Sequence, residues 1–192
     1  MPRKYARKYL DELIKSIDNI PLDKVEEIAD LLKEAYKKGR RIFVMGNGGS
    51  AATASHFVCD LAKGSGVKGK KKFKVIGLTD NVPLLTAWGN DASYDDIFSA
   101  QLEPLLEKDD IVMVFTGSGN SKNILKAVKY ANSARAHTIA CTGFNGGKVK
   151  DLAKTCLIVP SNNMERIEDI HLVLEHLIHL YLLEEIKEGR LE

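Results

Sequence analysis

The feature that most constrains this chain is a glycine-rich turn that joins an apolar run to a helical pattern. The apolar run at 41–45 predicts a buried strand, the turn covers 46–50, and apolar residues then recur at helical spacing up to Leu61. Glycine lets a backbone approach a ligand closely, and the free N–H groups of a first helical turn bind anions. We therefore expect a phosphate site at Gly48, Gly49 and Ser50.

A second turn repeats this architecture further along the chain. An apolar run at 110–115 leads into Thr116, Gly117, Ser118 and Ser121, and a helical pattern follows. Hydroxyl groups and backbone N–H groups together suit a terminal phosphate monoester. A serine before a helix can also be only an N-cap, and this alternative stays open for Ser50 and Ser121. Two such turns indicate a phosphorylated small molecule as the ligand.

The order of the predicted elements favours an α/β fold with a parallel sheet. Five strands, expected at 41–45, 73–78, 110–115, 138–141 and 155–159, alternate with helices, so both faces of the sheet should be covered. Ligands of such sheets bind outside the carboxyl ends of the strands. Two amphipathic helices, expected at 1–19 and 21–39, precede the first strand. We expect them to form an oligomer interface, with packing on the chain's own sheet as the alternative.

Composition excludes several classes of function. The chain has 192 residues, a net charge of +2 and 44% hydrophobic residues, which suits one globular domain and gives no sign of a nucleic-acid or membrane partner. Three cysteines without CxxC spacing and the lack of a signal peptide or apolar span point to the cytoplasm. A lysine-rich loop at 63–74 is either a mobile solvated segment or a basic rim for an anionic substrate.

Titratable residues on two helices are the candidates for chemistry. His56 and Asp60 are four residues apart, so they share a helical face and could ligate a metal or orient a base. The last helix, expected at 165–187, carries more such residues. Helical spacing groups four of them on one face and leaves His176 to the side: Glu168, His171, Glu175 and His179. The spacing therefore nominates this helix without choosing an acid or a base.

A phosphate anchor, a carboxylate and a histidine together suit aldose–ketose isomerisation of a sugar phosphate. The carboxylate would remove a proton from carbon to give an enediol, and the histidine would shuttle protons between the oxygens. A metal ion with histidine and carboxylate ligands could stabilise the developing charge.

In combination, four motifs resemble the SIS (sugar isomerase) domain family, most closely its sedoheptulose-7-phosphate isomerases. They are GNGGSA at 46–51, GND at 89–91, GSGNS at 117–121 and RIEDIHLVLEH at 166–176. The resemblance covers nearly the whole chain. It implies one flavodoxin-like three-layer domain at 1–192 with a five-stranded parallel sheet, in which helices at 1–39 precede a core at 40–192. It also implies a homotetramer that converts sedoheptulose 7-phosphate to D-glycero-D-manno-heptose 7-phosphate.

The resemblance also assigns roles to residues. It implies phosphate contacts from Ser50, Thr116, Ser118 and Ser121, and substrate contacts that include the turn glycines Gly48, Gly49 and Gly117 as well as Asn47, Asp91 and Glu168. One zinc ion would be held by His56, Asp60, Glu168 and His176, with Asp60 as base and His176 as acid. Three positions depart from the family pattern. The family has Glu at the position of Asp60, Gln at the position of Glu168, and a hydroxyl residue at the position of Gly117.

Two other functions compete with an isomerase. Some relatives in this family form the same tetramer and bind a replication initiator protein, but they tend to lack the acid and base that His176 and Asp60 would supply. Gly46, Gly48 and Ala51 also fit the GxGxxA pattern of dinucleotide-binding proteins. Because that pattern leaves the second hydroxyl-rich turn unexplained, we rank it third, behind the initiator-binding protein.

Overall fold

The computed structural model describes residues 2–191, so Met1 and Glu192 of the predicted domain lie outside the described residues. Its centre is a sheet of five parallel strands in the order β2-β1-β3-β4-β5. The strands are β1 (Arg41–Met45), β2 (Lys74–Gly77), β3 (Ile111–Thr116), β4 (His137–Thr142) and β5 (Thr155–Ile158). This order is that of flavodoxin-like folds, so the predicted fold class and sheet are confirmed.

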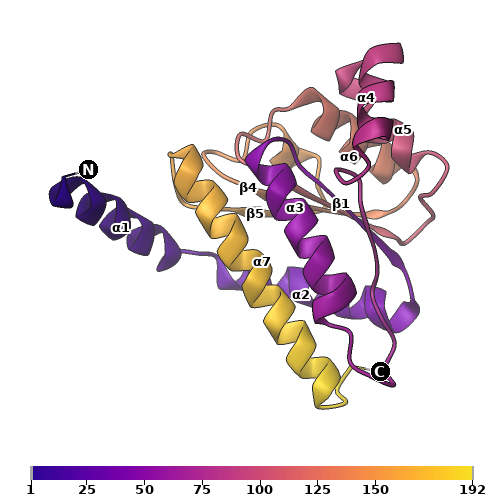
Figure 1. Ribbon diagram of the computed structural model, residues 1–192, viewed down its shortest axis with the longest axis horizontal. Coiled ribbons are helices and arrows are strands. Elements are labelled where there is room, and N and C mark those ends of the chain that lie inside the picture. The colour runs from indigo at the N-terminus through magenta and orange to yellow at the C-terminus, as the bar shows by residue number, and fades with distance from the viewer. Residues whose placement is uncertain (1, 192) are drawn as a thin grey trace.

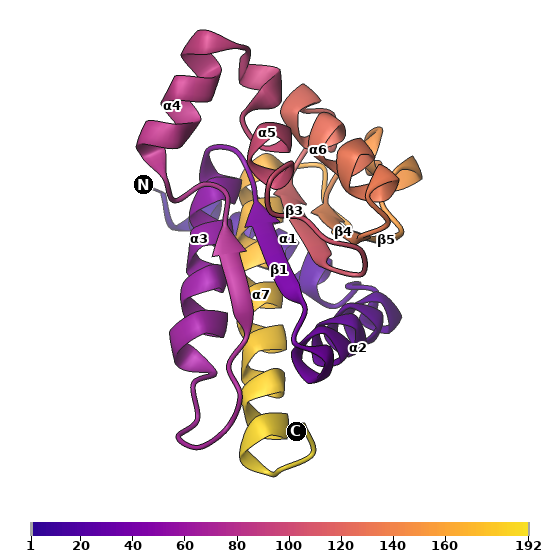
Figure 2. The ribbon, with the colours of Figure 1, turned by 90° about the vertical axis from the view of Figure 1, so that its right-hand side faces the viewer.

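Helices cover both faces of the sheet (Figures 1 and 2). They are α1 (Arg3–Ile17), α2 (Leu22–Lys38), α3 (Gly49–Cys59), α4 (Val82–Asp91), α5 (Ser99–Leu102), α6 (Lys122–Ser133) and α7 (Met164–Lys187). Three short elements were not predicted: a π-helical turn at Asp60–Gly64 and 3-10 turns at Tyr94–Asp96 and Val149–Asp151. Helix α5 was not predicted either, because four residues are too short to show a helical period.

Alternating side chains along each strand feed two hydrophobic cores. In β1, Ile42 and Val44 point to the core shared with α2, α3 and α7, whereas Phe43 and Met45 point to the core shared with α5 and α6. All four are fully buried. A strand that is buried on both faces reads as a continuous apolar run, which is why the sequence pattern identified these strands.

The two leading helices differ in their environment. Helix α2 packs its buried face, which includes Ile28 and Leu32, against the chain's own sheet. Helix α1 projects away from the body (Figure 1) and leaves Leu10 and Ile14 about half exposed. Contacts between its polar residues and α7 hold it in place, namely Tyr9 with Asp169 and Glu12 with Arg166. An interface role for residues 1–39 stays a prediction.

The parallel register brings the two glycine-rich turns to the same edge of the sheet. Strands β1 and β3 are neighbours, with Met45 paired to Val114, so the turns that follow them leave the sheet side by side. None of the helices within residues 2–191 combines the length and the apolar character needed to cross a membrane.

Candidate functional site

The first turn is built so tightly that it requires glycine. Gly48 has φ +56° and ends the turn at the N-terminus of α3. A Cβ added at Gly46 would collide with the backbone oxygen of Ser50 and lie 2.6 Å from its carbonyl carbon. Ser50 itself is buried. The chain thus passes from β1 into α3 with the N–H groups of the first helical turn facing the carboxyl edge of the sheet.

Asn47 links the first turn to the helix that follows the second turn. Its side-chain amide and that of Asn123 exchange two hydrogen bonds of 2.9 Å, and the hydroxyl of Tyr94 donates to its Oδ1 at 3.1 Å. These contacts hold the two turns in one arrangement. Asn47 was predicted from the sequence as a site residue, whereas Asn123 and Tyr94 were not. For Asn123, its place two residues after Ser121 in a polar turn was the available signal.

The second turn keeps its serine hydroxyls available. Thr116 ends β3 and is buried, and Thr142 donates to the backbone oxygen of Gly117 at 3.3 Å. Ser121 stands at the N-cap of α6, yet within the described chain its side chain makes no capping hydrogen bond. Ser118 accepts a backbone hydrogen bond of 3.3 Å from Asn120. The alternative that Ser121 is only a helix cap is therefore not supported.

Four titratable side chains converge where α3 and α7 pack side by side (Figures 1 and 2). His56 comes from α3, Asp60 from the π turn that directly follows α3, and Glu175 and His176 from the middle of α7. One ligand atom from each can be chosen so that all four atoms lie within 4.8 Å of one another. The rings of His56 and His176 meet edge to face with centroids 4.9 Å apart. We refer to these four residues as the His-carboxylate cluster.

The distances inside the His-carboxylate cluster suit a shared ion better than direct hydrogen bonds. Asp60 Oδ2 lies 3.9 Å from His56 Nε2 and 4.0 Å from His176 Nε2. Glu175 lies near the same rings, at 3.9 Å from His56 Nδ1 and 3.6 Å from His176 Nε2. Both imidazoles are nearly half exposed, whereas Glu175 is fully buried. The cluster thus has an open side and a buried side.

Burial and a like charge both act on Glu175. Removal from water raises its pKa to about 7, and the Asp60 carboxylate adds to the rise. Neither carboxylate oxygen has a hydrogen-bond partner within residues 2–191. A buried carboxylate without partners is expensive, so this side chain is placed to meet a positive charge.

The structure places Glu168 away from the His-carboxylate cluster, although the resemblance predicts it as a metal ligand. Its carboxylate covers the first turn: a Cβ added at Gly49 would lie 2.5 Å from both of its oxygens. It precedes Glu175 by seven residues on α7, roughly 10 Å along the axis. The set expected from the resemblance was His56, Asp60, Glu168 and His176. The structure instead brings Glu175 to the cluster, because the C-terminal end of α3 lies beside α7 two turns beyond Glu168, whereas Glu168 lies beside Gly49 at the start of α3.

A π-helical turn carries Asp60 into the His-carboxylate cluster. The turn begins at Asp60, and Ser65 N–H donates to the Asp60 backbone oxygen at 2.9 Å. His179 braces the turn from α7, since its ring hydrogen-bonds the backbone of Asp60 and its Nδ1 lies 3.4 Å from Ser65 Oγ. A Cβ at Gly64 would lie 2.5 Å from His179 Cε1. π turns often occur at functional sites.

His171 lies in the hydrophobic core rather than in the His-carboxylate cluster. It is fully buried with its ring centroid 5.6 Å from that of Phe115, and burial lowers its pKa from 6.5 to about 4. Of the three histidines that spacing left open on the last helix, only His176 belongs to the cluster.

The buried His171 predicts a pH-dependent stability. Its pKa is lower in the folded chain, so the unfolded chain binds the proton first as pH falls. Stability from His171 is complete above about pH 6.5 and is lost towards pH 4, by about 3 kcal/mol. Glu175, whose pKa is raised, shifts stability in the opposite direction. We therefore expect the free energy of unfolding to fall more between pH 7 and pH 4.5 in wild type than in His171→Leu. Urea unfolding of both proteins at the two pH values measures this difference. An identical pH slope in both proteins would contradict it.

A cavity of about 380 Å³ lies beside the first turn. Its lining includes Asn47, Gly48, Thr79, Gly89 and Tyr94. Asp91, expected among the substrate contacts, lies at the exposed end of α4, where its carboxylate accepts a hydrogen bond of 2.7 Å from Asn90. In this arrangement Asp91 does not line the cavity.

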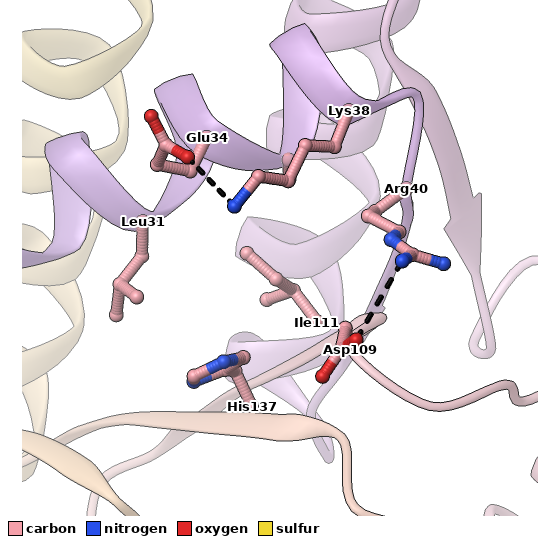
Figure 3. A pocket seen from close by; sticks show the side chains of 8 residues that line it. Leu31, Glu34, Lys38, Arg40, Asp109, Ile111 and His137 are labelled. Atoms are coloured by element: carbon pink, nitrogen blue, oxygen red, sulfur yellow. Dashed lines mark ion pairs between the residues drawn. The ribbon is translucent and has the colours of Figure 1, made fainter.

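Another cavity of about 380 Å³ lies at the opposite end of the sheet (Figure 3). Glu34 and Lys38 of α2 form an ion pair of 2.9 Å on one side, and Arg40 and Asp109 form one of 3.5 Å on the other. His137, at the start of β4, faces the space between them. The cavity lies at the amino ends of the strands and contains none of the predicted site residues.

Comparisons with known proteins found similar sequences and a similar solved structure. Residues 4–143 match the family described as the SIS domain. A probable phosphoheptose isomerase of Thermoplasma acidophilum is 41% identical over 173 residues, which cover 90% of this chain and 94% of that protein. A phosphoheptose isomerase of Aquifex aeolicus is 39% identical over 154 residues, with 80% of each chain covered. The structure of phosphoheptose isomerase GmhA from Neisseria gonorrhoeae superimposes with a TM-score of 0.87 at 30% identity and covers 94% of this chain and 97% of that chain.

Proposed function

This chain belongs to the SIS domain family, and from that premise we propose that it is a phosphoheptose isomerase. The reaction we propose converts sedoheptulose 7-phosphate to D-glycero-D-manno-heptose 7-phosphate. The observation that carries the proposal is that α3 begins at the first glycine-rich turn and ends beside the His-carboxylate cluster. A phosphate anchor and a proton-transfer group set one helix length apart suit a phosphorylated sugar of fixed length.

The phosphate is held by the two turns at the carboxyl edge of the sheet. Ser50, Thr116, Ser118 and Ser121 supply hydroxyls, and the backbone of Gly48, Gly49 and Gly117 allows close approach. The Asn47–Asn123 pair keeps the turns together. Glu168 lies over the first turn, where its carboxylate can accept a hydrogen bond from a sugar hydroxyl.

Proton transfer falls to Asp60 and His176. Asp60 removes the proton from C1 of the open-chain ketose, and the electrons of that C–H bond form the C1–C2 double bond of an enediol as the C2 carbonyl oxygen takes a proton. His176 moves protons between the two oxygens. Return of a proton to C2 and loss of the C1 hydroxyl proton give the aldose. Both side chains are on the open side of the cluster, with 22% and 45% of their surface exposed.

The His-carboxylate cluster also fits a divalent metal. Two imidazoles and two carboxylates form a donor set that zinc accepts, and the two partnerless oxygens of Glu175 are the observation that supports an ion there. We propose one zinc ion per chain, held by His56, Asp60, Glu175 and His176. When bound, it would supply Lewis-acid stabilisation of negative charge on the sugar oxygens.

We further propose a cytoplasmic homotetramer. Exposed apolar side chains on α1 and α7, among them Leu10, Ile14, Leu177 and Leu180, support burial against other copies. The cysteines are free rather than paired, which supports a reducing compartment. Light scattering coupled to gel filtration measures the number of copies.

A proton NMR assay tests the function. Purified protein is mixed with sedoheptulose 7-phosphate, with and without a chelator. We expect a new anomeric aldose signal that is lost on chelation and returns with zinc. No aldose signal at any zinc concentration would overturn the proposal and would favour the family's binding proteins, which lack turnover.

The role of Ser121 gives a second expected result. Ser121→Ala removes one hydrogen bond to a charged phosphate, which contributes about 1.5–3 kcal/mol, so KM should rise about 10- to 100-fold with little change in kcat. Ser133→Ala is the matched control, because Ser133 lies at the far end of α6 and donates to the Tyr130 backbone oxygen. Steady-state kinetics of both variants measure the effect. An unchanged KM in Ser121→Ala would count against the second turn as the phosphate site.

A further inference from the structure

The buried side of the His-carboxylate cluster is formed by Glu175. Its side chain has no exposed surface, whereas Asp60 keeps 22% of its own. A substrate on the open side can therefore contact Asp60 but not Glu175. Asp60 can therefore act on the sugar directly, whereas Glu175 is not the base that touches the sugar.

The surroundings of Glu175 leave its carboxylate without a hydrogen-bond partner in the described part of the chain. The imidazole nitrogens of His56 and His176 lie 3.9 Å and 3.6 Å from its oxygens, beyond hydrogen-bond distance. Asp60 adds a second negative charge nearby. Burial of a carboxylate costs several kcal/mol unless a positive group or hydrogen bonds compensate. Nothing hydrogen-bonds to its oxygens in the described part of the chain, so a cation between the four side chains would satisfy them.

We propose that Glu175 is the ligand on which tight binding of a divalent cation depends, and that it makes the metal-free protein less stable than it would be with an apolar residue there. Metal binding and folding stability are then coupled through one buried side chain. The inference rests on the proposed function only in using the same cluster, and its tests measure metal binding and unfolding rather than turnover.

Metal affinity is the first test. Metal-free wild type, Glu175→Gln and Glu168→Gln are each titrated with zinc in competition with a chromophoric chelator. Loss of a residue that hydrogen-bonds to a metal ligand weakens metal binding up to about 100-fold. Glu175→Gln removes a charged ligand itself, so zinc binding should weaken at least about 100-fold. Glu168→Gln is the matched control and should stay within about 3-fold of wild type, because its carboxylate lies over Gly49. Equal weakening in both variants, or no weakening in Glu175→Gln, would overturn the inference.

Thermal unfolding is the second test, and it does not require metal to be bound. Metal-free Glu175→Leu should unfold at the same temperature as metal-free wild type or higher, because replacing a buried charge with an apolar side chain is often neutral or stabilising. Added zinc should raise the Tm of wild type and leave that of the variant nearly unchanged. A metal-free variant that unfolds well below wild type would show that Glu175 already has adequate partners, contrary to the inference.

The two tests separate this inference from the proposed function. If zinc binding depends on Glu175 while the NMR assay shows no aldose, the ligand assignment stands and the isomerase assignment fails. If aldose forms and zinc binding does not depend on Glu175, the isomerase assignment stands and the ligand assignment fails.

Discussion

Asp60→Asn is expected to lower kcat for sedoheptulose 7-phosphate by about 10²- to 10⁴-fold, the usual contribution of a positioned acid or base. Asparagine matches aspartate in shape but cannot accept a proton from carbon. The fold should be retained, because Asp60 is partly exposed and its backbone, rather than its carboxylate, makes the π-turn hydrogen bond. Steady-state kinetics at saturating zinc, together with thermal unfolding, measure both effects.

Asp60→Glu is the matched control for this loss. It keeps the carboxylate and adds one methylene, so it should retain far more activity than Asp60→Asn at the same zinc concentration. Equal loss in the two variants would mean that packing at this position, rather than proton transfer, limits turnover. Undiminished activity of Asp60→Asn would reassign the base to another group.

Gly46→Ala should have the largest effect on stability. Its Cβ would collide with the backbone of Ser50, and a backbone cannot rotate away as a flexible side chain can. Relief of the clash requires the first turn of α3 to shift from β1. We expect the free energy of unfolding to fall by about 3 kcal/mol, at the upper end of overpacking effects. Urea unfolding measures this change.

Gly48→Ala separates the clash from the general cost of replacing glycine. Gly48 has φ +56°, but a Cβ there would meet no atom of the described chain within 4 Å. Only the backbone cost of a positive φ with ψ −124° remains, about 1–3 kcal/mol. Gly46→Ala should therefore be the more damaging of the two. A greater loss in Gly48→Ala would contradict the tight turn described here.

The fold was largely predictable because its strands are buried on both faces. Apolar runs such as Arg41–Met45 show this burial directly, and the glycine-rich turn fixes where β1 gives way to α3. Shorter elements escaped prediction. The π turn at Asp60–Gly64 depends on contacts with His179 from a helix far along the chain, which local periodicity cannot reveal.

The sequence identified the helices and the titratable residues of the candidate site, but it did not show which of these residues lie together. Spacing on the last helix grouped Glu175 with Glu168 and left His176 aside, whereas α3 packs so that Glu175 and His176 both meet His56. Which turn of α7 contacts α3 is set by how both helices lie on the sheet. The sequence of either helix alone does not contain that register, and the expectation of Glu168 as a ligand came from the family resemblance rather than from helical spacing.

We propose that this chain moves a proton between C1 and C2 of a sugar phosphate through Asp60 and His176. The most direct measurement is the reaction of sedoheptulose 7-phosphate in D₂O, followed by NMR. Because the Asp60 carboxylate, which holds the transferred proton, keeps 22% of its side-chain surface exposed, that proton should exchange with solvent. We expect deuterium at C2 of the aldose, with none incorporated by Asp60→Asn. Aldose that carries no deuterium, or unreacted ketose alone, would contradict the proposal.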